Sequence, residues 1–243
     1  MNIPHIRSLI RILAMLIIAG SSSSIKAETI IIGGYDYPPF MDANSKQGIY
    51  HKLMLALSQQ TGLTFQWQYY PYARLNKLFE KGLVHIEVGS APEWTTQSSE
   101  PGIYTEAFYD LQDIALFKSG EAFKIKSPTD IKGKTIGVVR GYGFEDFENM
   151  FKSKQALRSD ATDESQLLQM LLNERMDAIF INKDVFRHHS INQPLYRELE
   201  QGDIVGSYEI ALRIYPSFKK LIPSLNKAIK TLKQKDLILP MFQ

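Results

Sequence analysis

The sequence predicts an α/β protein of two lobes, in which each lobe has a mostly parallel sheet flanked by helices and two hinge strands join the lobes. Short apolar runs typical of strands alternate with longer amphipathic runs, and this pattern occurs on both sides of a polar segment at residues 118–134. No low-complexity or flexible linker separates the two halves. Because the two halves follow each other without a linker, lobes that share hinge strands are favoured over independently tethered domains.

The first unit begins with a β-branched run that ends in Gly33-Gly34, which indicates a buried strand followed by a turn. Alternation of aromatic and polar residues at 65–69 predicts a strand with one buried face, and Pro71 is suited to the start of a helix. The unit is therefore expected to contain strands at residues 29–33, 65–69, 84–88 and 111–117, and helices between Gly48 and Gly62 and between Pro71 and Gly82.

The second unit repeats the pattern. Gly141-Tyr142-Gly143 is expected to form a turn, and Thr162 and Asp163 can cap a leucine-rich helix. The predicted elements are strands at residues 135–139, 177–181 and 209–214, a helix at 144–151, and a C-terminal amphipathic stretch that carries Leu221, Leu225, Ile229 and Leu232.

The N-terminal segment has the pattern of a secretory signal peptide. Arg7 and Arg11 precede a short apolar run at residues 12–19, and Ala27 is a suitable small residue before a cleavage site. The apolar run is shorter than the roughly 20 residues that span a bilayer. We therefore expect residues 1–27 to be removed and the product to be free in the periplasm.

Charge and cysteine content narrow the classes of partner and chemistry. Of 28 basic residues, Arg7, Arg11 and Lys26 precede the expected cleavage site, which leaves 25 against 26 acidic residues. This balance does not indicate a nucleic-acid partner. The chain has no cysteine, which excludes disulfides, thiol catalysis and a lipid-anchored N-terminal cysteine.

Several short motifs together resemble the family 3 periplasmic solute-binding proteins, the polar-amino-acid type that serves ABC transporters. They occur in the family's order over essentially the whole chain after residue 27: Asp36-Tyr37-Pro38-Pro39-Phe40, Leu78-Phe79-Glu80-Lys81-Gly82, Gly89-Ser90-Ala91-Pro92-Glu93, the segment 130–138, and Met176-Asp177-Ala178. The resemblance implies the type II periplasmic-binding-protein fold. One lobe would comprise residues 28–116 plus 209–243 and the other residues 117–208, with hinge strands crossing near 113–118 and 204–209.

The chain departs from the family at the two charged anchors of an α-amino acid. Trp94 stands where the family has an arginine for the ligand's carboxylate, and Asn182 corresponds by spacing to the aspartate that binds the amine. A buried ligand charge without a partner costs several kcal/mol on a rough scale. An α-amino acid held in the family's usual manner is therefore not expected.

Arg74 is the candidate replacement anchor, because a planar guanidinium suits bidentate capture of a carboxylate. The alternative role is that of a surface arginine that only packs its stem. Tyr37 and Trp94 are expected to supply aromatic contact with the ligand. The full set of expected ligand-binding residues is Tyr37, Arg74, Ser90 and Trp94 on one wall of a cleft, and Arg140, Tyr142 and Asn182 on the other.

These residues predict a solute-binding protein that closes on a small polar, carboxylate-bearing metabolite and presents it to an inner-membrane ABC permease. Two alternatives stay open: a ligand sensor for a membrane receptor, and a dehydratase-like enzyme on the same fold. The histidines, which include His51, His85 and the pair His188-His189, show no metal-ligand spacing, and no nucleophile motif or phosphate loop occurs. We expect no catalysis, no metal, no cofactor and a monomeric protein.

Overall fold

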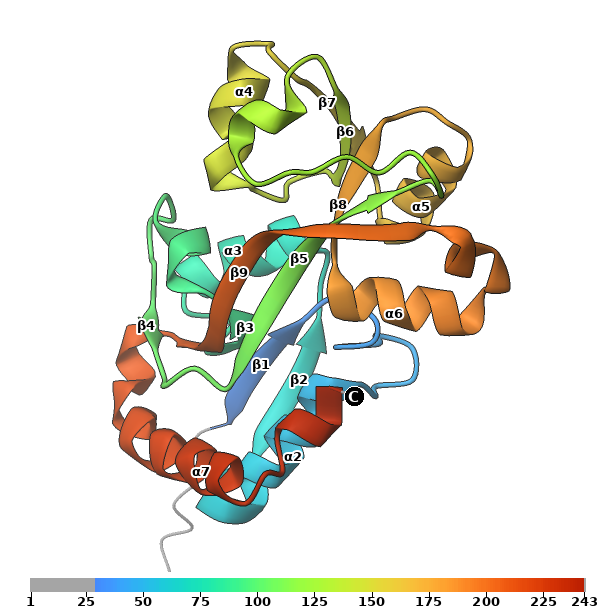
Figure 1. The fold of residues 1–243 in the computed structure, drawn as a ribbon. Coiled ribbons are helices and arrows are strands. Elements are labelled where there is room, and N and C mark those ends of the chain that lie inside the picture. Colours follow the sequence, from blue (N-terminus) through green and yellow to red (C-terminus); the bar gives the residue numbers. More distant parts are fainter. Residues whose placement is uncertain (1–28, 243) are drawn as a thin grey trace, which may run out of the picture.

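The computed structural model describes residues 29–242, so the predicted signal segment, residues 1–27, lies outside the described part of the chain. The strands follow the order β2-β1-β3-β9-β5-β8-β6-β7, with β4 paired to β9 beside this path, and they pass through two lobes (Figure 1). Strands β1, β2 and β3 pair in parallel, as do β6, β7 and β8. This arrangement confirms the predicted α/β fold with two lobes.

The first lobe combines the beginning and the end of the described chain. Helix α2 ends at Gly62, whose φ of 71° suits a residue without a side chain. Helix α3 begins directly after Pro71, as the sequence predicts. The elements of this lobe are β1 (Ile30–Gly34), α2 (Ile49–Thr61), β2 (Phe65–Tyr69), α3 (Tyr72–Glu80), β3 (Ile86–Ser90), η1 (Pro92–Thr95), β4 (Ile103–Tyr104), η5 (Pro216–Leu221), α7 (Ile222–Gln234) and η6 (Leu239–Phe242).

The second lobe is formed by the middle of the chain. Asp163 caps α5 by accepting a hydrogen bond from the backbone N–H of Gln166 at 2.8 Å, as its position in the sequence predicts. The elements are η2 (Pro128–Ile131), β6 (Thr135–Val139), η3 (Glu145–Phe147), α4 (Glu148–Lys152), β7 (Leu157–Ala161), α5 (Glu164–Leu172), β8 (Ala178–Asn182), α6 (Lys183–Asn192) and η4 (Pro194–Glu198).

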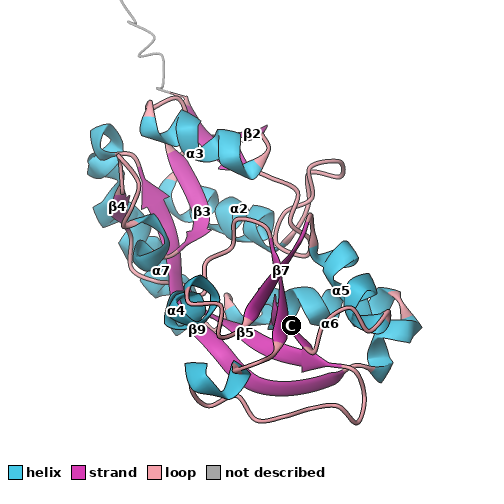
Figure 2. Cartoon of the chain, turned by 90° about the horizontal axis from the view of Figure 1, so that it is seen from above, coloured by secondary structure: helices cyan, strands magenta, loops and turns pink. Residues whose placement is uncertain are grey.

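Two long antiparallel strands, β5 (Tyr109–Phe117) and β9 (Glu200–Ile214), run from one lobe into the other (Figures 1 and 2). β9 pairs with β3 in the first lobe, whereas β5 pairs with β8 in the second. Their mutual register shifts between Asp113 and Leu116, within the stretch where the hinge is expected. The residue limits of the lobes, 28–116 plus 209–243 and 117–208, stay predictions.

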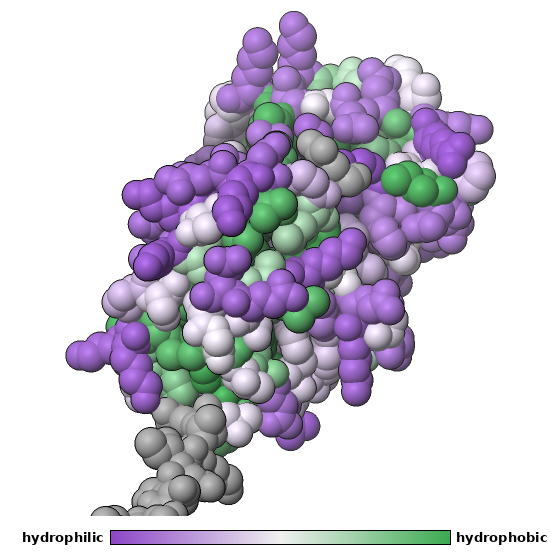
Figure 3. All heavy atoms as spheres, turned by 90° about the horizontal axis from the view of Figure 1, so that it is seen from below, coloured by the Kyte–Doolittle hydropathy of each residue, from purple (hydrophilic) through white to green (hydrophobic). Residues whose placement is uncertain are grey.

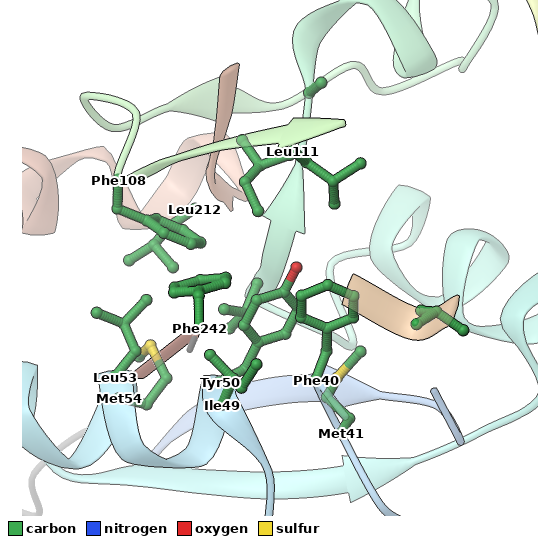
Figure 4. Close-up of a cluster of buried hydrophobic side chains, with 14 of the residues drawn as sticks. Phe40, Met41, Ile49, Tyr50, Leu53, Met54, Phe108, Leu111, Leu212 and Phe242 are labelled. Carbon is green, nitrogen blue, oxygen red and sulfur yellow. The ribbon is translucent and has the colours of Figure 1, made fainter. Parts of the chain in front are cut away.

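Hydrophobic packing joins the C-terminus to the first lobe. Phe242 is fully buried and stacks on Tyr109 with ring centroids 3.7 Å apart. Figure 4 shows Phe242 among side chains of α2 and of the segment before it, including Tyr50 and Phe40. A second hydrophobic core includes side chains of β6 and β8, and in it Phe144 and Phe147 pack edge-on against Phe180.

Three elements differ from the sequence-based expectation. The segment predicted as one helix, 144–151, is a 3₁₀ turn followed by the short α4, because Phe144, Phe147 and Met150 point inward at a spacing of three. β9 covers both the hinge strand expected near 204–209 and the stretch predicted at 209–214, and it begins four residues earlier, where Gly202 interrupts the apolar alternation. The polar edge strand β7 has no strand-like sequence and depends on its pairing with β6.

Hydrophilic side chains surround smaller hydrophobic areas on the face that carries α2 and α7 (Figure 3). This agrees with the amphipathic pattern of α7, in which Leu225, Ile229 and Leu232 are buried while the lysines face outward. Within residues 29–242, no helix combines the length and the apolar character that a membrane crossing needs.

Candidate ligand-binding cleft

A cavity of about 400 Å³ lies between the two lobes. Its lining comes from the segment after β1, from the start of α3 and from η1 on one side, and from the segment after β6, α4 and α5 on the other. Both hinge strands also contribute, through Asp113 of β5 and Tyr208 of β9. A concave site of this size between two lobes is typical of small-molecule binding.

Aromatic rings form much of the wall on the first-lobe side. Tyr35 and Tyr37 stack with centroids 5.4 Å apart, and Tyr35 also contacts Tyr72 at 5.0 Å. Gly89 allows the chain to pass close to Tyr50 beneath the cleft. At φ 78°, a Cβ added to Gly89 would lie 2.0 Å from the Tyr50 hydroxyl. This part of the wall is therefore defined by close backbone packing.

Two aromatic contacts cross between the opposing sides of the cleft. Tyr142, after β6, meets Tyr37 edge to face with centroids 6.4 Å apart. Trp94 meets Tyr208 of β9 in the same manner at 5.1 Å. Edge-to-face geometry places the positive ring edge on the negative ring face. Rings from different parts of the lining thus contact one another across the cavity.

Carboxyl groups are the second feature of the cleft. Asp113 and Glu164 are partly buried and line the cavity. Burial raises the pKa of Asp113 to about 7, with a further contribution from the nearby negative charge of Glu164, while the Asn182 amide opposes the shift. Burial likewise raises the pKa of Glu164.

Tyr142 and Glu164 are joined by a hydrogen bond in which the Tyr142 hydroxyl donates to Glu164 Oε1 at 2.9 Å. Burial raises the pKa of Tyr142 well above its usual value, so this hydroxyl keeps its proton. Glu164 lies in the first turn of α5, where the helix dipole favours a negative charge. The pair therefore presents a fixed acceptor oxygen to the cavity.

The structure brings four of the seven expected ligand-binding residues to the cleft: Tyr37, Trp94, Tyr142 and Asn182. Asn182 also has a structural role. Its Oδ1 accepts from the backbone N–H of Asp184 at 3.0 Å and of Val185 at 3.1 Å, which caps α6. Its Nδ2 donates to the carbonyl of Gln112 at 3.2 Å and so ties β8 to the hinge strand.

The other three residues, Arg74, Ser90 and Arg140, are not among the described residues that line the cavity. Arg74 is exposed, because α3 turns Leu75 and Phe79 toward the core, and its guanidinium lies 5.6 Å from the ring centre of Tyr70. Ser90 is buried behind the wall, with its hydroxyl 3.5 Å from that of Tyr104. Arg140 is exposed beyond the end of β6.

Most of the other lining residues were not expected from the sequence, and those that matter most here are Tyr35, Tyr72, Asp113, Glu164 and Tyr208. Asp113 carried a usable signal, since it is an acidic residue directly before the apolar run 114–117 of a buried strand. Tyr35 carried a weaker one, since it precedes Tyr37 by two positions. Tyr208 and Glu164 had none, because their approach to the cleft depends on how the lobes are placed.

Two of the histidines pack against aromatic side chains in the first lobe. His85 accepts a hydrogen bond from the Ile31 N–H at 3.1 Å and stacks on Phe218 with centroids 4.0 Å apart. His51 stacks on Trp67 at 4.2 Å. Within residues 29–242, no group of three or more His, Asp or Glu side chains is placed to hold a metal ion.

Comparison with solved structures identifies the fold. The GluR0 ligand-binding core in complex with L-glutamate superposes with a TM-score of 0.75 at 16% identity, covering 89% of this chain and 97% of that one. An ancestral arginine-binding protein bound to arginine gives 0.69 at 20% identity, covering 88% and 96%. The fold is that of the periplasmic binding proteins. The predicted likeness to solute-binding proteins is confirmed at this level.

A third similar structure belongs to a sensor. The sensor domain of a histidine kinase, described as similar to periplasmic binding proteins, gives a TM-score of 0.71 at 15% identity, with coverage of 88% and 94%. All three are described as ligand-binding or sensor domains. A scan against protein-family models and a search of curated protein sequences find no match.

Proposed function

We propose that this protein is a periplasmic binding protein that closes its two lobes on a small polar ligand and presents the ligand to a membrane transporter. The observation that carries the proposal is the cavity of about 400 Å³ between lobes joined by two continuous strands, with aromatic and carboxyl side chains from both sides. Closure of such a cleft expels water and strengthens the polar contacts within it.

Delivery to an ABC permease and docking on a membrane receptor both require a closed, liganded form. The substrate-binding protein of an amino acid ABC transporter has the same fold, with a TM-score of 0.68 at 21% identity, and supports the first role. The histidine kinase sensor domain supports the second. We favour transport, in which a monomer released by removal of residues 1–27 moves freely in the periplasm.

A carboxylate on the ligand stays a prediction, because the expected anchor Arg74 is exposed outside the lining of the cavity. Lys152 is the one basic side chain among the described lining residues that could receive it. The sequence-based expectation of a carboxylate thus has weaker support than that of a polar ligand.

Thermal-shift screening of the purified protein against a small-metabolite library tests the proposed function. A true ligand at about 100 times its Kd stabilises the folded state by about 2.7 kcal/mol and so raises the Tm. Trp94→Ala should abolish the shift while leaving the apo Tm nearly unchanged, because Trp94 is 41% exposed without ligand.

Arg74→Ala is the matched comparison. If the shift survives this substitution, Arg74 is a surface residue; if Arg74→Ala abolishes the shift, the arginine belongs to the site. Ligands whose shifts survive Trp94→Ala bind elsewhere and contradict the proposed cleft.

A further inference from the structure

We propose that the cleft is built for an organic cation, whose ammonium or guanidinium group lies against Asp113 and Glu164 and beside the rings of Tyr37 and Tyr142. The proposal rests on the proposed function and adds the charge class of the ligand. It is supported by the charges that line the cavity, by the environment of the two carboxyl groups and by the arrangement of the rings.

Acidic side chains dominate the charges of the lining. The described lining residues include the acids Glu93, Asp113, Glu145, Glu148 and Glu164, but only one base, Lys152. Glu148 is neutralised within the protein, because Arg158 Nη1 lies 3.4 Å and Lys152 Nζ 3.9 Å from its carboxylate oxygens. Among residues 29–242, none of the other four acids forms an ion pair. An anionic ligand would meet uncompensated negative charge here.

Asp113 is an unusual residue for its position. It lies on the hinge strand β5, directly opposite Asn182 of β8 and Gly206 of β9, in a strand that otherwise buries Leu111, Ile114 and Ala115. A partly buried carboxyl without a cationic partner destabilises the apo protein. A cation in the cleft would provide that partner. Carboxyl groups with a strongly perturbed pKa in a cleft are typical of functional sites.

Glu164 offers a second acceptor from the other lobe. Its Oε1 accepts the Tyr142 hydroxyl at 2.9 Å, which orients the carboxyl group and leaves its remaining lone pairs for a ligand. The negative charge of Glu164 contributes to the raised pKa of Asp113. A cation beside both carboxyl groups would remove this repulsion.

The aromatic rings are an independent observation that favours the same class of ligand. Tyr35 and Tyr37 stack on one side of the cavity, and Tyr142 approaches Tyr37 from the other lobe. Ring faces attract a cation within about 6 Å of their centres, by about 0.5–2 kcal/mol each in general. Rings and carboxyl groups together form the kind of surroundings that recognise ammonium groups.

The test is calorimetric titration of the whole protein with charged probes and their uncharged isosteres. Choline is compared with its neutral carbon isostere, putrescine with butanediol, and succinate serves as the anion. We expect at least one cation to bind in the cleft, at least about tenfold more tightly than its neutral isostere. Asp113→Asn should weaken this binding by about tenfold or more.

Asp110→Asn is the matched control, because Asp110 lies on the same strand, is exposed and is not part of the cleft lining. It should leave cation binding unchanged. Trp94→Ala should weaken the binding of cations and of any other cleft ligand alike. This variant therefore tests whether a probe binds in the cleft, whereas Asp113→Asn tests whether the positive charge of the probe matters.

The pH dependence of cation binding provides a second readout. Asp113 must lose its proton to pair with a cation, and its pKa is about 7, so cation affinity should fall by up to about tenfold from about pH 8 to about pH 6. Binding should release a proton in the lower part of this range. The titratable groups coupled electrostatically to Asp113 are Glu164, Tyr37, Tyr142 and Tyr208, and the Asn182 amide opposes the rise in its pKa.

Two outcomes would disprove the proposal that the ligand is a cation. Equal or tighter binding of a neutral isostere or of succinate, lost in Trp94→Ala, would disprove the charge class and leave the proposed function standing. Failure of all cations to bind at millimolar concentration, while another library member binds in the cleft, would do the same. Absence of any cleft ligand would count against the proposed function as well.

Discussion

Arg213→Ala is expected to lower the free energy of unfolding by about 3–5 kcal/mol, because it leaves the carboxylate of Glu87 buried without its partner. Arg213 is 1% exposed, and its Nη1 lies 3.0 Å from Glu87 Oε2. Its Nε donates to the carbonyl of Pro101 at 3.0 Å, and its guanidinium lies 4.0 Å from the ring centre of Phe79. One side chain thus connects β9, β3, α3 and the segment before β4.

Urea unfolding of Arg213→Ala, compared with Glu87→Gln and with the double variant, measures this effect. Glu87→Gln should cost less than Arg213→Ala, because the guanidinium keeps its carbonyl acceptors. The deficit of Arg213→Ala should shrink as the pH falls, since burial already raises the pKa of Glu87 and protonation removes the uncompensated charge. A decrease in the free energy of unfolding of less than about 1 kcal/mol, which is typical of an exposed ion pair, would contradict a buried pair between Arg213 and Glu87.

Asp113→Asn is expected to have the opposite effect on stability. The pKa of Asp113 is about 7 in the folded protein against 3.8 in an unperturbed carboxyl, so the folded state holds a proton that the unfolded chain has released. Stability therefore falls as the pH rises from about 4 to about 7, and the full penalty applies above that window. With allowance for partial exposure, the substitution should stabilise the apo protein by about 1–3 kcal/mol at about pH 8.

Thermal or urea unfolding across this pH range checks the prediction, with Asp110→Asn as the control on the same strand. The gain in Asp113→Asn should disappear below about pH 4, where the carboxyl group is protonated in both the folded and the unfolded wild-type protein. If the variant is less stable than wild type at about pH 8, or if the difference in stability does not depend on pH, the ionised Asp113 carboxyl does not destabilise the folded protein. Stability gained together with ligand affinity lost would indicate a residue retained for binding.

The fold was largely predictable from the sequence because its elements follow local rules. Pro71, Gly62 and Asp163 end or begin helices through backbone geometry and capping, which are properties of a few neighbouring residues. β7 and the beginning of β9 were not predictable in this way, since their polar or glycine-containing sequences become strands only through pairing with neighbours.

The site was predictable only in part. Tyr37 and Trp94 follow elements whose ends point to the cleft, so their positions in the motifs located them. Arg74 was expected at the cleft because of its charge, but the helix directs it to solvent, since Leu75 and Phe79 determine the buried face of α3. The acidic character of the cavity depends on Asp113 and Glu164, which are far apart in sequence and come to the same cavity only because β5 pairs with β8 in the folded protein.

Ligand-dependent closure is the most direct test of the central claim. The chain contains no cysteine, so Lys77→Cys on α3 and Asn149→Cys on α4 introduce two unique labelling sites, both exposed and on opposite lobes. Pulsed electron–electron resonance between spin labels at these positions should show a distance that shortens and narrows when a cleft ligand binds. An unchanged distance distribution, with occupancy of the cleft confirmed by calorimetry, would contradict the two-lobed closing mechanism.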